Sequence, residues 1–352
     1  MAFQSAMGYS FINTRIRARK AKLLSAADYE NLLEARDLDE LTRRLVESDY
    51  YSLFQDAGSQ LDVLDGKLNQ SFVHETKTLA TGLPKASQRF VEFYFRRYFL
   101  DGLKTILRAF ETETSWEEIQ IHLVGTEEET KELQDLMTAD SLSLMIDRLS
   151  DSDLRDILGD QIELAESSKT TVPLELAIDR WFFTNLWKNI RHILKGTDFE
   201  FAQQFVGNQI DLLNIQAVLR IKRQFPEFDD RTIRDLLIPV NYRLHDILDR
   251  CITAASPTEV FNHLLESSYR DFARLARESF EETGSLRDLE IRVKGHLHYL
   301  AFRMLLGQPF HIGAFLAYLV LKATEMQNVR AITVGVTSRV DKARIRQHIL
   351  IP

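Results

Sequence analysis

The chain reads Glu40-Leu-Thr-Arg-Arg-Leu-Val-Glu-Ser-Asp-Tyr50 in its first part and Glu259-Val-Phe-Asn-His-Leu-Leu-Glu-Ser-Ser-Tyr269 in its last third. Seven of these eleven positions are identical or exchange one aliphatic residue for another. The apolar residues of both stretches recur at the spacing of one helix face. The shared Glu-Ser-x-Tyr ending adds a register that helical periodicity alone does not require. The pattern therefore predicts a helical unit that the chain repeats.

A second segment recurs about a third of the chain apart, as Gly102-Leu-Lys-Thr-Ile-Leu-Arg108, Asn214-Ile-Gln-Ala-Val-Leu-Arg220 and, less completely, Asn328-Val-Arg-Ala-Ile332. Repeated helical units that each expose an apolar face stack and share a core. We therefore predict three similar helical lobes, at residues 1–97, 98–209 and 210–352, the last with a C-terminal tail. The alternative is that leucine-rich amphipathic helices resemble one another by chance.

The composition favours an all-α fold. The chain has 352 residues with 45% apolar content, but only 14 glycines and 7 prolines, so residues that interrupt helices are scarce. Six glycines are predicted near helix ends: Gly58, Gly82, Gly125, Gly196, Gly207 and Gly284. Only the segment Ile332–Val336 alternates as a short strand would.

Charge and cysteine content exclude some classes of partner. The formal net charge of −8 gives no general attraction for nucleic-acid phosphates. The single cysteine, Cys251, cannot form an internal disulfide, which indicates a reducing, cytoplasmic setting. The most apolar window, Met304–Leu321, is too interrupted to cross a membrane and predicts a buried helix from Pro309. Any membrane association is then expected through a partner.

Catalytic motifs are missing from the sequence. It contains no G-x-x-x-x-G-K-[ST], G-x-G-x-x-G, H-E-x-x-H, C-x-x-C or G-x-S-x-G pattern, so we predict no catalytic, cofactor-binding or metal-binding residue. Asp229, Asp230 and Asp235 resemble the aspartate-rich magnesium sites of all-α enzymes that act on diphosphates. Because Asp229 and Asp230 directly follow Phe228, capping a helix is the simpler role.

Several stretches in order along the chain resemble the C subunit of the prokaryotic V/A-type rotary ATPase, which is similar to the d subunit of the eukaryotic vacuolar enzyme. They are Tyr9 with Arg15 and Arg17, then 41–50, Pro173–Arg180, Asp211–Ile215 with Arg220, and Pro309–Ile332 containing Glu325-Met-Gln-Asn-Val-Arg-Ala-Ile. The resemblance implies three lobes around a pseudo-threefold axis that form a funnel. The sequence departs from the family pattern at Gly102, where asparagine is more typical.

The same resemblance implies a non-catalytic central-stalk subunit that couples rotation of the shaft to the membrane proteolipid ring during proton or sodium transport. Its expected partners are the shaft subunits and the ring, and its expected place is cytoplasmic and peripheral to the membrane. The alternatives are an all-α, magnesium-dependent enzyme that uses the three aspartates, and a free-standing helical scaffold.

Basic side chains are the candidate partner-binding residues. One group lies in a stretch without acidic residues and fits acidic groups of the shaft or ring, or is simply an exposed helix face. The other group recurs near the ends of the repeated helices, where cations also offset the helix dipole. The candidates are Arg15, Arg17, Arg19 and Lys20 in the first group, and Arg108, Arg220 and Arg330 in the second.

Overall fold

The computed structural model describes residues 2–58, 60–120 and 123–351, and no strand occurs in these ranges. The all-α prediction is confirmed. The segment Ile332–Val336 lies inside helix α19 (Ile312–Thr337), so its short alternation does not indicate a strand. A short apolar pattern cannot by itself separate a buried helix from a strand. No helix in the described ranges is long and apolar enough to cross a bilayer.

The chain forms two compact units, each built from separate stretches of sequence. Unit 1 comprises Met1–Gln88, Glu117–Thr130 and His298–Pro352, and unit 2 comprises Arg89–Trp116 and Lys131–Leu297. The three lobes and their pseudo-threefold funnel stay a prediction.

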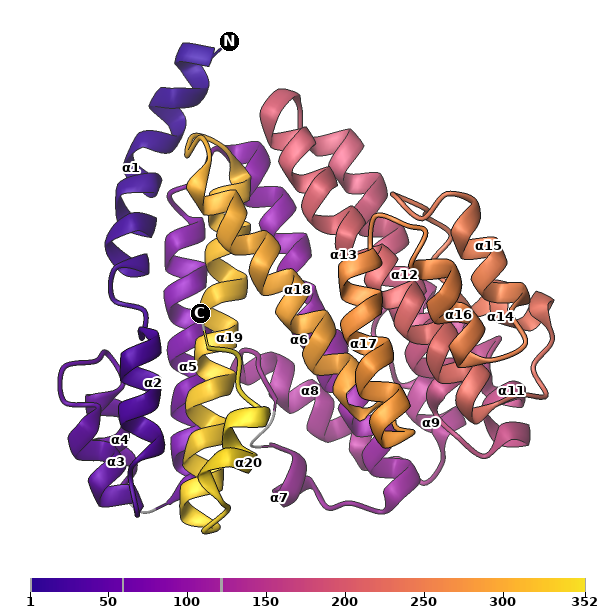
Figure 1. Cartoon of the computed structure of the whole chain (residues 1–352), viewed down its shortest axis with the longest axis horizontal. Helices are drawn as coiled ribbons and strands as arrows, with labels where there is room; N and C mark the ends of the chain where they lie inside the picture. The colour runs from indigo at the N-terminus through magenta and orange to yellow at the C-terminus, as the bar shows by residue number, and fades with distance from the viewer. Residues whose placement is uncertain (1, 59, 121–122, 352) are drawn as a thin grey trace. The chain divides into compact units, whose positions relative to one another are not determined.

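Helix α19 is the central helix of unit 1. Its residues Ile312–Leu319 are all buried, and α1, α2, α3, α5 and α20 pack against it. Figure 1 shows α19 in yellow beside the indigo and purple N-terminal helices, so unit 1 joins the two ends of the chain. Its other helices are α1 (Ala2–Lys20), α2 (Ala26–Leu33), α3 (Leu38–Arg44), α4 (Tyr51–Ala57), α5 (Leu61–Ala80), α7 (Trp116–Ile119) and α20 (Lys342–Gln347).

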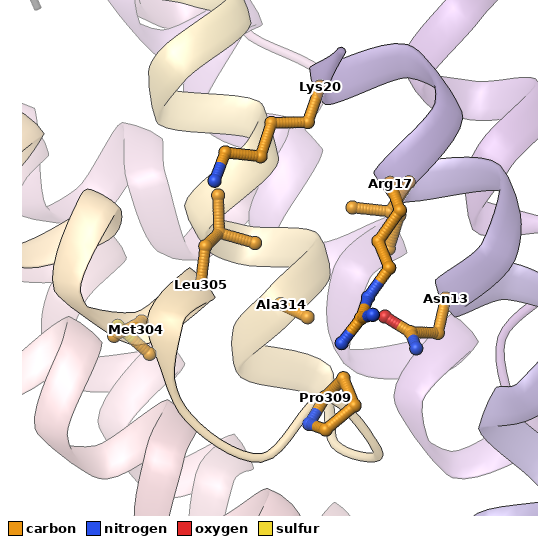
Figure 2. Close-up of a pocket in the computed structure, with 8 residues that line it drawn as sticks. Asn13, Arg17, Lys20, Met304, Leu305, Pro309 and Ala314 are labelled. Carbon is orange, nitrogen blue, oxygen red and sulfur yellow. The ribbon is translucent and has the colours of Figure 1, made fainter.

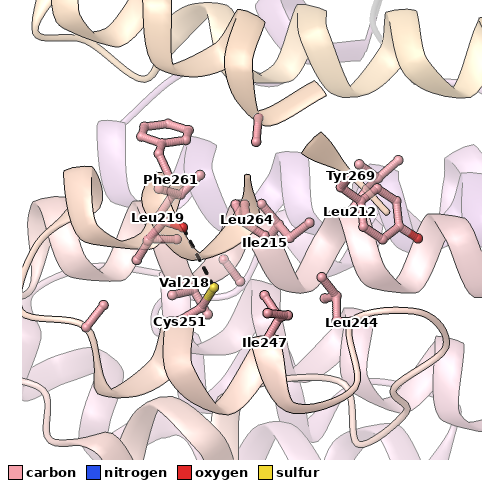
Figure 3. Close-up of a cluster of buried hydrophobic side chains, with 14 of the residues drawn as sticks. Leu212, Ile215, Val218, Leu219, Leu244, Ile247, Cys251, Phe261, Leu264 and Tyr269 are labelled. Atoms are coloured by element: carbon pink, nitrogen blue, oxygen red, sulfur yellow. Dashed lines mark hydrogen bonds between the residues drawn. The ribbon is translucent and has the colours of Figure 1, made fainter. Parts of the chain in front are cut away.

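Unit 2 is organised around the antiparallel pair α12 (Val172–Ile193) and α13 (Gly196–Gln224). Figure 3 shows its apolar core, where Leu212, Ile215 and Val218 of α13 meet Phe261 and Leu264. The remaining helices are α6 (Lys85–Thr112), α8 (Glu127–Met137), α9 (Leu142–Asp147), α10 (Ser152–Gly159), α11 (Ile162–Ser168), α14 (Asp230–Leu236), α15 (Asp246–Thr253), α16 (Pro257–Leu264), α17 (Arg270–Thr283) and α18 (Arg287–Leu306). Residues of α6, α7, α8 and α18 are divided between the two units.

The repeated segment begins with the same cap in both units. Asp37 and Ser256 are the N-cap residues of α3 and α16, and each accepts a hydrogen bond from the backbone N–H three residues on. Glu40 and Glu259, at that third position, accept from the backbone N–H just before the cap. This reciprocal arrangement satisfies donors that a helix start leaves free.

The Glu-Ser-x-Tyr ending also has one structure in both units. The hydroxyls of Ser48 and Ser267 each donate to a carbonyl three residues earlier, at 2.7 Å. Each serine oxygen then accepts the backbone N–H of the tyrosine, Tyr50 or Tyr269, at 3.3 and 3.0 Å. The serine therefore ends one helix and turns the tyrosine ring into the core, where both rings are buried.

The predicted helix ends are confirmed at Gly58 and Gly284, whereas the prediction for Gly207 is wrong. Gly58 and Gly284 follow α4 and α17 with positive φ angles of 57° and 63°, which favour glycine. Gly207 instead lies in the middle of α13. A Cβ at this position would come within 2.4 Å of the Tyr242 ring, so glycine is needed there for close packing rather than for a helix end.

Candidate interaction site

Helix α1 has one buried face, and its cations lie in different environments. Tyr9, Ile12 and Ile16 are buried at helical spacing, and the Tyr9 hydroxyl lies 2.7 Å from Ser87 Oγ. Arg17 is exposed and Arg15 is half-buried, with its guanidinium carbon 5.5 Å from the centroid of the Phe11 ring. Of the predicted basic stretch, Arg17 is therefore exposed, whereas Arg15, Arg19 and Lys20 are only partly exposed.

A pocket of about 240 Å³ lies between the basic end of α1 and the α18–α19 turn. Figure 2 shows Arg17 and Lys20 reaching into this space from α1, with an apolar wall opposite. We call it the basic pocket. Its lining is Asn13, Ile16, Arg17, Lys20, Met304, Leu305, Pro309 and Ala314.

The cations of the basic pocket are not used by the rest of the described chain. Arg17 and Lys20 form no ion pair in the described ranges, and Lys20 Nζ lies 5.2 Å from the centroid of the exposed Phe302 ring. Asn13, which also lines the pocket, is only 8% exposed. Two cations without an ion-pair partner beside apolar carbon suit a negatively charged group carried on an apolar body.

Arg19 has a different environment from Arg17. Its Nη1 lies 2.8 Å from Glu75 Oε1 of α5, and the Tyr318 hydroxyl of α19 donates to the same carboxylate. Arg19 therefore ties α1 to α5 and α19. Its role as a partner-binding residue stays a prediction, as do those of the other six cations.

Arg330 is held inside unit 1. Its Nε donates to Asp65 Oδ1 and its Nη2 donates to Asn69 Oδ1, both at 2.7 Å. The Asn69 amide in turn donates to the Leu123 carbonyl at 2.6 Å. These contacts join α19, α5 and the segment after α7, and they leave the Arg330 side chain 17% exposed.

Arg108 and Arg220 come together in unit 2, although they lie on different helices. Arg108 Nη2 donates to Glu175 Oε2 at 2.5 Å, and Arg220 Nη1 lies 3.7 Å from the same oxygen. Glu175 is buried, whereas the Arg108 side chain is 55% exposed. The pair of guanidinium groups is therefore partly available to a second acidic group.

The three aspartates of the magnesium hypothesis have separate roles. Asp229 caps α14, because its Oδ1 accepts the Thr232 N–H at 2.7 Å. Asp230 lies 3.4 Å from Lys222 Nζ, and Asp235 is exposed. No group of three or more His, Cys, Asp or Glu side chains in the described ranges could hold a metal ion.

The sequence reasoning missed a buried carboxylate in unit 1. Glu325 of α19 accepts the Tyr50 hydroxyl at 2.7 Å and the Leu24 backbone N–H at 2.6 Å. Lys322 Nζ donates to it at 2.8 Å. Burial, followed by the charge of Glu325, raises the pKa of Tyr50 well above its usual range.

Unit 2 has a matching carboxylate, which was also missed. Asp211 of α13 accepts the Tyr269 hydroxyl at 2.8 Å and the backbone N–H groups of Tyr242 and Arg243 at 3.0 and 2.7 Å. Burial raises the pKa of Asp211, although these hydrogen bonds act in the opposite direction.

An asparagine follows each carboxylate by three residues. Asn328 exchanges two hydrogen bonds with the backbone of Leu350, at 2.7 and 2.9 Å, and Asn214 exchanges two with Ile238, both at 3.0 Å. We call each set of carboxylate, tyrosine and asparagine a carboxylate–tyrosine module. The recurring acid-x-x-Asn spacing is the sequence signal that could have found it. The apolar wall of the basic pocket has no such signal, because it depends on a long-range contact.

The chain matches the family described as ATP synthase (C/AC39) subunit over residues 12–348. It is 23% identical to the C subunit of the A-type ATP synthase of Methanocaldococcus jannaschii, in an alignment that covers 96% of this chain and 85% of that protein. It is 24% identical to the corresponding protein of Haloferax volcanii, with 97% of each chain covered, and 22% identical to that of Pyrococcus furiosus, with 96% and 89% covered.

These matches confirm the resemblance inferred from the sequence, and they cover nearly the whole chain. They leave the enzyme and free-scaffold alternatives without support. The chain therefore belongs to the ATP synthase (C/AC39) subunit family and is a non-catalytic component of a rotary ATPase.

Proposed function

We propose that this chain is the central-stalk subunit that couples rotation of the shaft to the membrane proteolipid ring. The shaft and the ring are its two partners in this proposal, and it meets the membrane only through the ring, on the cytoplasmic side. Membership of a rotary ATPase family supports the proposal. So does the absence of catalytic motifs from the sequence.

The internal structure of each unit suits a part that transmits torque. Close-packed helices yield little under strain, because their interiors have the density of a crystal. The long helices α13 and α19 are also tied to short helices and loops by charged and paired hydrogen bonds. Such bonds are directional, so they resist sliding better than apolar contacts alone.

The basic pocket is the observation on which the partner assignment rests. Arg17 and Lys20 are unpaired within the described chain, and the wall opposite them is apolar. An acidic side chain on an apolar segment of the shaft would satisfy both features. The exposed side of Arg108 is a second candidate contact of the same kind.

The test is a charge reversal of the pocket, Arg17→Glu with Lys20→Glu. We expect at least tenfold weaker binding to the purified shaft subunits, because two attractive contacts become repulsive. In the assembled enzyme, ATP hydrolysis should continue while the number of ions transported per ATP falls.

Arg43→Glu with Lys85→Glu is the matched control, because both are exposed cations of unit 1 that form no ion pair in the described ranges. The control should bind within about twofold of the parent, as surface charges far from an interface have small effects. Equal binding by the two double variants would contradict the role of the basic pocket. Full ion transport by an enzyme that lacks this chain would contradict the coupling function itself.

A further inference from the structure

Unit 2 has a groove of about 600 Å³ that runs along α12 between α10 and the end of α14. One wall carries Asp153, Asp156 and Asp160, whose spacing places them on one face of α10 and its C-cap. Asp235 and Pro239 lie on the other side. We call this feature the acidic groove. Its three α10 carboxylates span about 10 Å along the helix axis.

The four carboxylates of the acidic groove have no partner in the described chain. Asp153, Asp156, Asp160 and Asp235 form neither an ion pair nor a side-chain hydrogen bond within the described ranges, and all four are exposed. Asp151, just before α10, shows the opposite arrangement, since Arg96 Nη2 lies 2.5 Å from its Oδ2.

Two cations, Arg180 and Lys188, also line the groove and likewise form no ion pair in the described ranges. They offset only part of the four negative charges. Like charges held on one helix face repel one another, and a cationic partner would relieve that repulsion.

The floor of the groove adds a second and independent observation. Trp181 and Thr184 line it from successive turns of α12. Trp181 is only 7% exposed, and its indole Nε1 has no hydrogen-bond partner in the part of the chain that the structure describes. The Thr184 hydroxyl oxygen is buried and also has no partner there. Buried donors of this kind normally have an acceptor, which a bound chain can supply through its carbonyl and amide oxygens.

We propose that the acidic groove binds a lysine- or arginine-bearing helical segment of another subunit of the rotary ATPase. Cations at positions i, i+3 or i+4, and i+7 of such a segment would match the carboxylates of α10. Its polar atoms would reach Trp181 and Thr184, and its apolar side chains would meet Leu236 and Pro239. The proposal goes beyond the shaft coupling, because it gives the chain a second contact of opposite charge on its other unit.

A metal ion does not fit the acidic groove as well, because no metal-holding cluster occurs in the described ranges. A single small cation would satisfy only one end of a row that extends over two helical turns. A segment of protein can satisfy the whole row and the floor together.

The test is the triple variant Asp153→Asn, Asp156→Asn and Asp160→Asn in the full chain. Each side chain is exposed and keeps its shape, so the fold should be unaffected. Binding is measured to the rotary ATPase from which this chain has been removed, at several salt concentrations. We expect binding about tenfold weaker than that of the parent at low salt, with a flatter dependence on salt.

The matched control removes three exposed aspartates of unit 2 outside the groove, Asp140→Asn, Asp147→Asn and Asp246→Asn. It should bind within about twofold of the parent. Trp181→Phe tests the floor by removing the indole N–H, and we expect binding about threefold weaker.

Three outcomes would overturn the proposal. The first is that the triple variant binds as tightly as the parent. The second is that the control variant loses as much binding as the triple variant. The third is that spermine binds in the groove without weakening the binding of the chain to the enzyme. The last would assign the groove to a small polycation. The Arg17→Glu, Lys20→Glu variant is measured in the same assay. Because this variant alters unit 1 and the triple variant alters unit 2, the assay tests the proposals for the basic pocket and the acidic groove separately.

Discussion

The two carboxylate–tyrosine modules hold a similar buried acid in different ways. Glu325 in unit 1 has one backbone N–H, one tyrosine hydroxyl and the Lys322 ammonium as donors. Asp211 in unit 2 has two backbone N–H groups and the Tyr269 hydroxyl, and forms no ion pair within the described ranges. The same sequence pattern therefore forms a module with an ion pair in unit 1 and a module held mainly by backbone hydrogen bonds in unit 2.

The difference follows from chain connectivity. In unit 2 the loop that presents Tyr242 and Arg243 comes soon after α13 and α14, so two adjacent N–H groups reach Asp211 together. In unit 1 the donor backbone belongs to Leu24, which is 301 residues from Glu325 in the sequence. Only one N–H reaches the carboxylate there, and Lys322, on the same helix, supplies the third donor.

The largest expected effect is the removal of the acid from the ionic module. Glu325→Leu leaves the buried Lys322 with the more distant Glu75, at 3.9 Å, as its acidic partner, and should lower the free energy of unfolding by about 4 kcal/mol. Urea denaturation monitored by circular dichroism measures the change.

The double variant Lys322→Met with Glu325→Leu should recover most of that loss, because it removes both charges of the pair. A double variant as unstable as Glu325→Leu alone would show that the module in unit 1 is not governed by the ion pair.

Removal of the other acid should cost somewhat less. Asp211→Ala leaves the two backbone N–H groups and the Tyr269 hydroxyl without their buried acceptor, but it strands no charge. We expect a loss of about 3 kcal/mol in the same denaturation experiment. A loss larger than that of Glu325→Leu would reverse the comparison between the modules.

The tyrosine hydroxyls should contribute less than the acids. Tyr50→Phe and Tyr269→Phe each delete one hydrogen bond to a buried carboxylate, at 2.7 and 2.8 Å, while keeping the ring in the core. Each should lower the free energy of unfolding by about 1.5 kcal/mol. If only one variant is destabilised, the two modules are alike in geometry but not in energy.

Asp211 should also make the stability of the chain depend on pH. Burial raises its pKa in the folded state, so the native chain keeps this proton at pH values where the unfolded chain has lost it. The free energy of unfolding contributed by Asp211 is therefore complete below the ordinary carboxyl pKa and falls as pH rises through the raised value.

The asparagine of Asp211→Asn cannot titrate. The amount by which its free energy of unfolding falls below that of the parent should therefore shrink as pH rises from the ordinary carboxyl pKa through the raised pKa of Asp211. Denaturation of both proteins at several pH values gives the difference, in which the other titrating groups cancel. A deficit that is constant or grows with pH would contradict the assigned direction of the Asp211 pKa.

Much of the repeat could be predicted from local sequence. The shared Glu-Ser-x-Tyr ending indicated a repeated unit, and the bonds at Asp37, Glu40 and Ser48 that shape this unit all lie within a few residues. The same holds for the helical state of the chain, because few glycines and prolines interrupt it.

The long-range contacts could not be predicted in the same way. Which carboxylate receives the Tyr50 hydroxyl depends on how α19 packs, and Glu325 lies 275 residues away. The sequence alone suggests that Gly207 marks a helix end. The structure shows that the Tyr242 ring packs against it, a long-range contact that requires glycine. The basic pocket likewise needs the α18–α19 turn beside α1, which no local pattern specifies.

The reactivity of Cys251 reports on how readily unit 2 opens. This thiol is 2% exposed within the core in Figure 3, and burial raises its pKa to about 12. Both factors keep it from reacting with a disulfide reagent at pH 8, since the thiolate is the nucleophile.

Labelling should therefore require opening of unit 2, with a rate set by the opening equilibrium. Asp211→Ala should raise that rate on the order of 100-fold, in line with its loss of stability. Glu325→Leu, whose altered contacts lie in unit 1, should raise it less. Equal acceleration by both variants would show that the two modules stabilise one cooperative structure rather than separate parts of the chain.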